Sequence, residues 1–219
     1  MPVFHIKSDD REARILYIHI PKAGGISVTN FFKKIGFSEH FGRENSKLFP
    51  IMKYPPSHFD YKTLCSLFDI EKFDFRFTIV RNPYARLRSD FKFAMKANPA
   101  LRDNPVPFNF WVNKVLDGYE QDEYFLGHHI KPQHFFVGDK IDHIYKKEIG
   151  HREILEDVIK KIGGEINQSW DEIVPKANVG DDKYQIDDFD AETLGRVQEL
   201  YRLDFDRFDY DIDDYSIAK

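Results

Sequence analysis

Residues 16–27 read LYIHIPKAGGIS, and this stretch predicts more about the fold than any other in the chain. Its apolar first half is typical of a buried strand, expected over Ile15–Ile20, and the glycines at 24 and 25 predict a tight turn. Apolar residues then follow at helical spacing, at Val28, Phe31, Phe32 and Ile35. Backbone N–H groups at a helix N-terminus attract anions, so a strand, a glycine turn carrying Lys22 and a helix start predict an anion site.

The composition is typical of one folded domain, expected over residues 1–219. The chain has 219 residues, of which 42% are hydrophobic and 21 are Phe, a composition that argues against disorder. The net charge is −5, and residues 181–219 carry 13 Asp and Glu against 5 Lys and Arg. We expect this acidic C-terminal tail to be a solvated surface, and we expect no nucleic-acid partner.

The cellular setting is also constrained. No apolar run approaches the roughly 20 residues that span a bilayer, so no membrane span is expected. Residues 1–14 are charged, unlike a signal peptide. Cys65 is the lone cysteine, so no internal disulfide can form. These features favour a cytoplasmic, bacterial protein, and they leave its oligomeric state open.

Strands and helices alternate along the chain. Further strands are expected at Phe75–Val80, His134–Val137 and His143–Tyr145. Further helices are expected after the caps Asn82 and Asp190, over Phe108–Leu116, and over a segment from Ile154 that Gly163 ends, with a loop at Asn98–Pro107. This alternation predicts an α/β fold, a P-loop-like three-layer sandwich whose central, mostly parallel sheet is flanked by helices.

The lysine turn fits neither of two familiar nucleotide motifs. A Walker A motif places its lysine after the last glycine, whereas Lys22 precedes Gly24 and Gly25. The Gly-x-Gly-x-x-Gly pattern of dinucleotide-binding folds is absent from the sequence. A turn with a purely structural role is therefore an equal alternative on this stretch alone.

A second loop after the strand at Phe75–Val80 carries Arg81, with Ser89 two helical turns further on. An arginine fork and a serine hydroxyl both suit phosphate oxygens. The alternative is that Arg81 pairs with a carboxylate and Ser89 packs as a small residue. Ligands of parallel α/β folds lie at the carboxyl ends of strands, where both loops are expected. Two such sites indicate a ligand with two separated phosphate-like groups.

Five stretches together resemble the carbohydrate sulfotransferases, in particular the branch with heparan sulfate 2-O-sulfotransferase-like and bacterial members. The resemblance spans about residues 15–210. Pro21, Lys22, Ala23, Gly24, Gly25, Ile26 and Ser27 resemble the loop that binds the 5′-phosphosulfate, and Arg81 with Ser89 resembles the element that binds the 3′-phosphate. The other matching stretches are Ser57–Tyr61, His129–Gln133 and Leu200–Tyr210.

The resemblance implies the cofactor 3′-phosphoadenosine 5′-phosphosulfate, no metal, and transfer of a sulfuryl group to a hydroxyl of a saccharide or glycoconjugate acceptor. It implies that Lys22 meets the charge on the departing phosphate oxygen and that His58 is the general base. His129 is expected first as an acceptor-pocket or structural residue and second as a rival base. Lys131 and Gln133 are the other expected substrate-binding residues.

Two departures and several alternatives remain. Ala23 and Ile26 stand where many members have Thr, so two hydroxyls that would help hold the phosphate are missing. The acceptor could instead be a lipid or a small metabolite. A non-catalytic module that binds adenosine bisphosphate is the alternative outside enzymes. A kinase would need a magnesium-binding Ser/Thr and Asp pair that the sequence does not offer.

Overall fold

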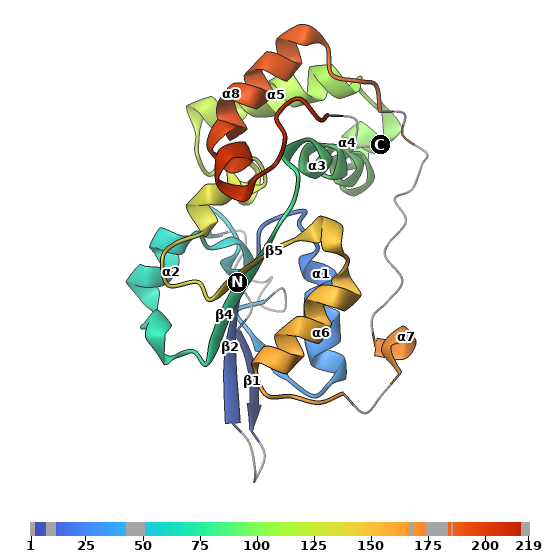
Figure 1. The fold of residues 1–219 in the computed structure, drawn as a ribbon. Helices are drawn as coiled ribbons and strands as arrows, with labels where there is room; N and C mark the ends of the chain where they lie inside the picture. Colours follow the sequence, from blue (N-terminus) through green and yellow to red (C-terminus); the bar gives the residue numbers. More distant parts are fainter. Residues whose placement is uncertain are drawn as a thin grey trace. The chain divides into compact units, whose positions relative to one another are not determined.

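The computed structural model describes residues 3–7, 12–42, 51–166, 169–173, 184 and 186–215. They belong to two compact units (Figure 1). The first unit combines Met1–Val80 with Phe135–Asn178, and the second combines Arg81–His134 with Val179–Lys219. Each unit has its own apolar core.

A mixed five-stranded sheet forms the centre of the first unit. Its strands, in sheet order, are β3 (Ser38–His40), β1 (Val3–Lys7), β2 (Glu12–Ile18), β4 (Phe75–Val80) and β5 (His143–Lys146). The predicted parallel arrangement is confirmed for β2, β4 and β5, whereas β1 is antiparallel to both β2 and β3. Residues 8–11, which join β1 to β2, are too few for the crossover that a parallel pair needs. The antiparallel strands β1 and β3 were not predicted from the sequence.

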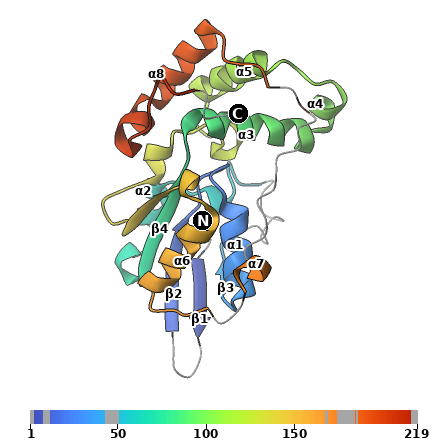
Figure 2. The same ribbon diagram turned by 45° about the vertical axis from the view of Figure 1, so that its right-hand side comes forward.

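Two helices of the first unit lie side by side against the sheet (Figures 1 and 2). These are α1 (Gly25–Lys34) and α6 (His151–Lys161). Their apolar faces and the strand residues form one core cluster, which includes Phe31, Ile154 and Phe77. The other helical segments of this unit are η2 (Pro56–His58), α2 (Tyr61–Leu67), η3 (Ile70–Lys72), η6 (Lys147–Ile149) and α7 (Trp170–Ile173). The three-layer arrangement itself stays a prediction.

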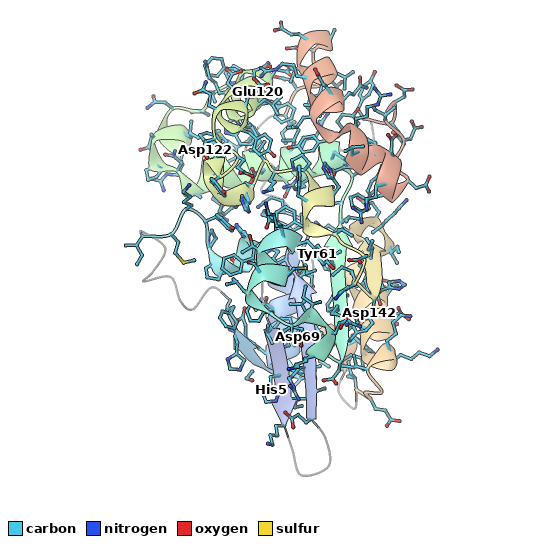
Figure 3. All side chains as sticks on the ribbon, turned by 90° about the vertical axis from the view of Figure 1, so that its left-hand side faces the viewer. His5, Tyr61, Asp69, Glu120, Asp122 and Asp142 are labelled. Atoms are coloured by element: carbon cyan, nitrogen blue, oxygen red, sulfur yellow. The ribbon has the colours of Figure 1, made fainter. Side chains whose placement is uncertain are left out.

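An ion pair ties β4 to the residue that precedes β5. Arg76 places Nη2 2.7 Å from Oδ1 of Asp142 and donates from Nε to Oδ2 at 2.8 Å. The backbone N–H of Arg76 donates to the same Oδ2 at 2.8 Å (Figure 3 labels Asp142). Burial raises the pKa of Asp142, but the bonds from Arg76 outweigh it and leave this pKa lowered. The pair therefore favours the ionised carboxylate that holds these parallel strands in register.

The second unit is helical. Its long helices α3 (Pro83–Ala97), α5 (Phe108–Gln121) and α8 (Ala191–Phe208) pack on one another around a second core (Figure 1). Both predicted caps are confirmed, since Asn82 accepts from Tyr84 N–H at 2.9 Å and Asp190 from Thr193 N–H at 2.8 Å. The shorter segments are α4 (Pro99–Asp103) and η4 (Phe125–His128).

Two local predictions were wrong. The expected loop at Asn98–Pro107 contains α4, because Asn98 caps it and a proline occupies its first position. The strand expected at His134–Val137 does not form, and Gln133–Phe136 is the 3₁₀ helix η5. The N–H groups of the first two η5 residues donate to a carboxylate of α8, at 2.7 and 2.8 Å, so they cannot donate to a neighbouring strand.

Candidate active site

A tight turn joins β2 to α1 and carries Lys22. The strand predicted to reach Ile20 ends at Ile18, and the Ala23 N–H donates to the Ile20 carbonyl at 3.2 Å. Lys22 has φ +68°, a left-handed conformation that is uncommon for a residue with a side chain. Such strained backbone persists only where surrounding structure holds it, and it is common at ligand sites.

The turn ends at Gly24, which is the N-cap of α1 and has φ +104°. The first helical bond runs from Ser27 N–H to the Gly24 carbonyl at 3.1 Å, so α1 itself does not use the N–H groups of Gly25 and Ile26. The first turn of α1 carries no acidic residue, and Ile26 is 51% exposed. The start of α1 is therefore electrostatically suited to an anion.

Two imidazole rings pack against the glycines of the turn. A Cβ atom on Gly24 would lie 2.3 Å from Nε2 of His151, the first residue of α6. A Cβ atom on Gly25 would lie 2.1 Å from Nε2 of His19, which directly follows β2. The close approach of a ring thus favours glycine at both positions, and the positive φ of Gly24 favours it there a second time.

His19 also contacts the predicted base. Its ring stacks on Tyr17, with centroids 5.8 Å apart, and meets the edge of the His58 ring at 5.5 Å. His58 is the last residue of η2, and its N–H donates to the Pro55 carbonyl at 2.8 Å. Burial raises the pKa of Tyr17, so its hydroxyl stays protonated beside these rings. His19 therefore connects the lysine turn with His58 inside the first unit.

The second loop leaves from the same edge of the sheet as the first. Ile18 and Thr78 are register partners in the parallel strands β2 and β4, and Thr78 Oγ1 donates to the Ile18 carbonyl at 2.7 Å. Arg81 follows β4 directly and is half-buried. Ser89 is also half-buried and lies in α3, whose first turn has no acidic residue.

Gln133 holds the backbone of Arg81. Its Oε1 accepts from the Arg81 N–H at 2.9 Å, and its Nε2 donates to the Arg81 carbonyl at 2.7 Å. Gln133 is fully buried, so both ends of its amide are engaged away from solvent. The structure thus brings together two of the predicted site residues in the second unit.

A buried carboxylate fixes Gln133 in turn. Asp204 of α8 is fully buried and accepts from the N–H groups of Gln133 and His134 at 2.7 and 2.8 Å. It also lies 2.8 Å from Nδ1 of His134. Three donors offset the cost of burying the carboxylate. The stretches 129–133 and 200–210 therefore meet next to the backbone of Arg81.

The other two predicted substrate-binding residues are each paired with a carboxylate. Nδ1 of His129 lies 2.6 Å from Oδ1 of Asp90 in α3. The buried Lys131 donates from Nζ to Oε2 of Glu123 at 3.1 Å. This bond lowers the pKa of Glu123, so the positive charge of Lys131 is already matched by a carboxylate.

The predicted site residues are divided between the two units. Pro21–Ser27 and His58 belong to the first unit, and Arg81, Ser89 and residues 129–133 belong to the second. The structure brings the lysine turn to His58 through His19, and it brings Arg81 to Gln133. The peptide bond between residues 80 and 81 joins the two sets along the chain.

Sequence reasoning missed His151, Asp90 and Asp204. His151 lies far along the chain from the glycine it contacts, so no local pattern reveals that contact. The position of Asp90 directly after Ser89 was the one available signal for it. Asp204 was counted with the acidic tail, although its place within the stretch 200–210 could have separated it from the surface charges.

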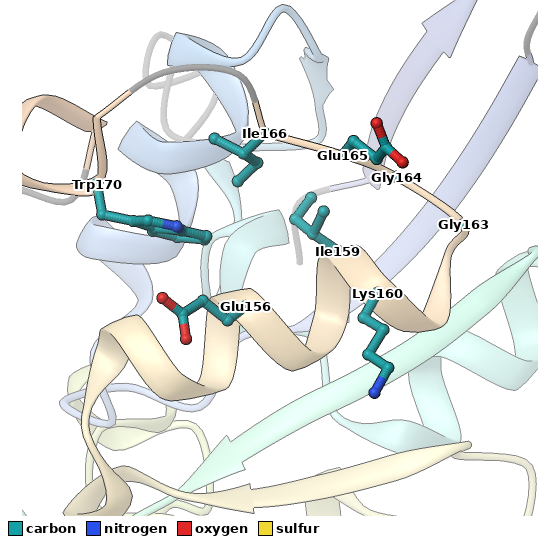
Figure 4. Close-up of a pocket in the computed structure, with 8 residues that line it drawn as sticks. All are labelled: Glu156, Ile159, Lys160, Gly163, Gly164, Glu165, Ile166 and Trp170. Atoms are coloured by element: carbon teal, nitrogen blue, oxygen red, sulfur yellow. The ribbon is translucent and has the colours of Figure 1, made fainter.

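A separate groove of about 400 Å³ lies between α6 and the segment that follows it (Figure 4). None of the predicted site residues lines it. Its lining residues are Glu156, Ile159, Lys160, Gly163, Gly164, Glu165, Ile166 and Trp170. The groove therefore takes no part in the site built around Lys22.

Two general features complete the description. Within the described residues, no group of three or more His, Cys, Asp or Glu side chains is placed to hold a metal ion. In the same part of the chain, no helix has the length and apolar character needed to cross a membrane.

The chain matches a known protein family. The model of a family described as the sulfotransferase family matches residues 5–211, which include the lysine turn, His58, Arg81 and the stretches near Asp204. No curated protein and no solved structure shows a match to the chain.

Proposed function

Because the chain belongs to the sulfotransferase family, we propose that it moves a sulfuryl group from 3′-phosphoadenosine 5′-phosphosulfate to a hydroxyl of a carbohydrate-containing acceptor. The observation that carries this proposal is the turn at Lys22 and Gly24, which ends at the N-terminus of α1. A family match alone would allow a chain that has lost its nucleotide site. A lysine and a glycine turn that leads into a helix N-terminus favour the binding of such an anion.

The residues present fit the cofactor. We propose that the N–H groups of Gly24, Gly25 and Ile26, with the Ser27 hydroxyl, hold the 5′-phosphate, and that Pro21 and Ala23 shape the turn. We propose that Arg81 and Ser89 hold the 3′-phosphate. The absence of acidic residues from the first turns of α1 and α3 supports both assignments, because an acidic side chain there would repel the anion.

Lys22 and His58 would carry the chemistry. The cofactor supplies an activated sulfuryl group, whose bond to the bridging phosphate oxygen breaks as the acceptor oxygen bonds to sulfur. His58 takes the proton from the acceptor hydroxyl, and Lys22 donates to the phosphate oxygen that leaves. A positioned donor of this kind is worth about 3–4 kcal/mol in the transition state.

The acceptor would be bound by residues of the second unit, with His129 and Lys131 as candidates. The structure supports a different role for Gln133, because both ends of its amide bind the backbone of Arg81. We propose that Gln133 acts through Arg81, as a positioning residue for the 3′-phosphate site. A lipid or small-metabolite acceptor is the alternative within the same reaction.

Thermal unfolding with added nucleotides tests the proposal. Adenosine 3′,5′-bisphosphate is expected to raise the midpoint more than ADP or AMP, because it alone carries separated 3′- and 5′-phosphates. Equal shifts with ADP would contradict the sulfotransferase assignment. Transfer of labelled sulfate from the donor to a panel of saccharides, lipids and phenols then separates the enzyme from a module that only binds.

A further inference from the structure

The second unit contains a histidine–carboxylate pair that the proposed chemistry does not use. Asp90 is 3% exposed, and its Oδ1 lies 2.6 Å from Nδ1 of His129. An ionised carboxylate only accepts, so Nδ1 carries the hydrogen of this bond. The lone pair of a neutral His129 ring is then on Nε2.

Three residues on one face of α3 hold His129. Arg86, Asp90 and Phe93 are four and three residues apart, a spacing that aligns side chains along a helix. Arg86 Nη2 donates to the His129 carbonyl at 2.6 Å, and the Phe93 ring stacks on the imidazole at 5.6 Å. The orientation of the His129 ring is thus set by three contacts: Arg86 at its backbone carbonyl, Phe93 on one face of the ring and Asp90 at Nδ1. The side chain still keeps 17% of its surface exposed.

A second histidine–carboxylate pair in the same unit has a purely structural role and serves as a comparison. His134 and Asp204 have nearly the same geometry, but Asp204 also accepts from two backbone N–H groups. Among the described residues, the carboxylate of Asp90 makes no hydrogen bond besides the one to His129. Asp204 therefore organises backbone, whereas Asp90 acts on a single imidazole.

We propose that Asp90 is a positioning residue that holds His129 in the tautomer whose Nε2 accepts a hydrogen bond from a hydroxyl of the acceptor. This inference rests on the proposed sulfuryl transfer, since it assigns the acceptor a binding group in the second unit. It separates the roles of two histidines, because His58 removes a proton and His129 fixes the position of the substrate. A buried carboxylate behind an imidazole is a general means of fixing its tautomer.

The tautomer can be measured without any substrate. In ¹⁵N-histidine spectra recorded at a pH at which the ring is neutral, His129 is expected to show a protonated Nδ1 and an unprotonated Nε2. Asp90→Asn removes the carboxylate at nearly equal volume and is expected to shift the ring toward the Nε2–H tautomer. A wild-type His129 found with the hydrogen on Nε2, or an unchanged tautomer in folded Asp90→Asn, would overturn the inference.

The role of His129 in acceptor binding is tested in a kinetic assay. The acceptor is the saccharide of the panel that receives most labelled sulfate from the donor. Asp90→Asn and His129→Ala are each expected to raise the KM for this acceptor about tenfold, the loss of one hydrogen bond. Because Asp90 acts through His129, the double variant should be no worse than His129→Ala. His5→Ala is the matched control, because it removes a histidine whose ring nitrogen lies 3.3 Å from a carboxylate, that of Glu12, away from the proposed site; its acceptor KM should stay unchanged.

Two kinetic results would overturn the assignment. An unchanged acceptor KM in folded Asp90→Asn would remove its positioning role. A fall in kcat alone, equal to that of His58→Ala, would make His129 a base rather than a binding group. Failure of the proposed function looks different, because the wild-type protein would then label no acceptor while its His129 tautomer could still be measured.

Discussion

Replacing Gly25 with alanine is expected to weaken nucleotide binding strongly while the protein still folds. The new Cβ would lie 2.1, 2.3 and 2.6 Å from three atoms of the His19 ring. That ring is stacked on Tyr17 and touches His58, so it cannot turn aside without disturbing both. Overpacking of this kind lowers the free energy of unfolding by about 1–3 kcal/mol. The higher helix propensity of alanine raises it by at most about 1 kcal/mol.

Gly24→Ala should be the more damaging neighbour. Its Cβ would lie 2.3 Å from Nε2 of His151, and its φ of +104° is unfavourable for alanine. The left-handed conformation adds about 1–2 kcal/mol to the same overpacking cost, so a total of about 2–5 kcal/mol is expected. Gly195→Ala is the control, because nothing lies within 4 Å of its Cβ position in α8. That change should stabilise the protein by about 0.5–1 kcal/mol.

Urea unfolding gives the free energies, and calorimetric titration with adenosine 3′,5′-bisphosphate gives the affinities. The expected order of stability is Gly195→Ala, wild type, Gly25→Ala, then Gly24→Ala. The double variant Gly25→Ala with His19→Ala should recover stability, because it removes the ring that the new methyl group meets. If Gly25→Ala binds the bisphosphate like wild type, or if removing His19 gives no recovery, the packing argument is refuted.

Four further results are expected. Lys22→Ala should lower the single-turnover rate about 100- to 1000-fold while the bisphosphate Kd changes only a few-fold, and an equal loss of binding would contradict a role on the leaving oxygen. His58→Ala should bind the bisphosphate normally but lose turnover by about 100-fold or more, and unchanged turnover would remove it as the base. Gln133→Ala should leave the N–H and carbonyl of Arg81 without their partner, so the bisphosphate affinity should fall about tenfold in calorimetry, and an unchanged affinity would show that Arg81 needs no such support. Asp142→Asn should cost about 1 kcal/mol at pH 7 in urea unfolding, because the lowered pKa of Asp142 gives stability that is present above its unfolded pKa and lost as the pH falls through the folded one. The stabilities of the two proteins should therefore converge as the pH falls through the folded pKa of Asp142, and a constant difference would contradict the ion-pair explanation.

Local patterns in the sequence predicted a large part of the fold. The strand at Phe75–Val80, the Asn82 cap and the helix that follows this cap are all confirmed, because each depends on neighbouring residues. The strands β1 and β3 were missed, since each is short and forms only by pairing with a partner elsewhere in the chain. The strand expected at His134–Val137 does not form, and the N–H groups of Gln133 and His134, the first two residues of the 3₁₀ helix found there, donate to the distant Asp204.

In the candidate site, too, features formed by consecutive residues could be predicted from the sequence, and contacts between separate elements could not. The glycine turn after β2 was predictable because its residues are consecutive. The imidazole of His151 against Gly24 and the pairing of Asp90 with His129 join residues from separate elements. Hydrophobic periodicity describes which face of an element is buried and carries no information on which polar groups meet across elements.

The carboxylates of the C-terminal segment lie in two different environments. Most of its carboxylates are on exposed positions, as a solvated surface predicts, but Asp204 is fully buried. Burying a carboxylate is costly unless donors replace water, and Asp204 has three of them at 2.7–2.8 Å. Those donors fix Gln133, and Gln133 fixes the residue that follows β4. Gln133 and the stretch 200–210 can therefore be explained as supports of Arg81, which places their effect on the nucleotide, whereas the proposed effect of His129 is on the acceptor.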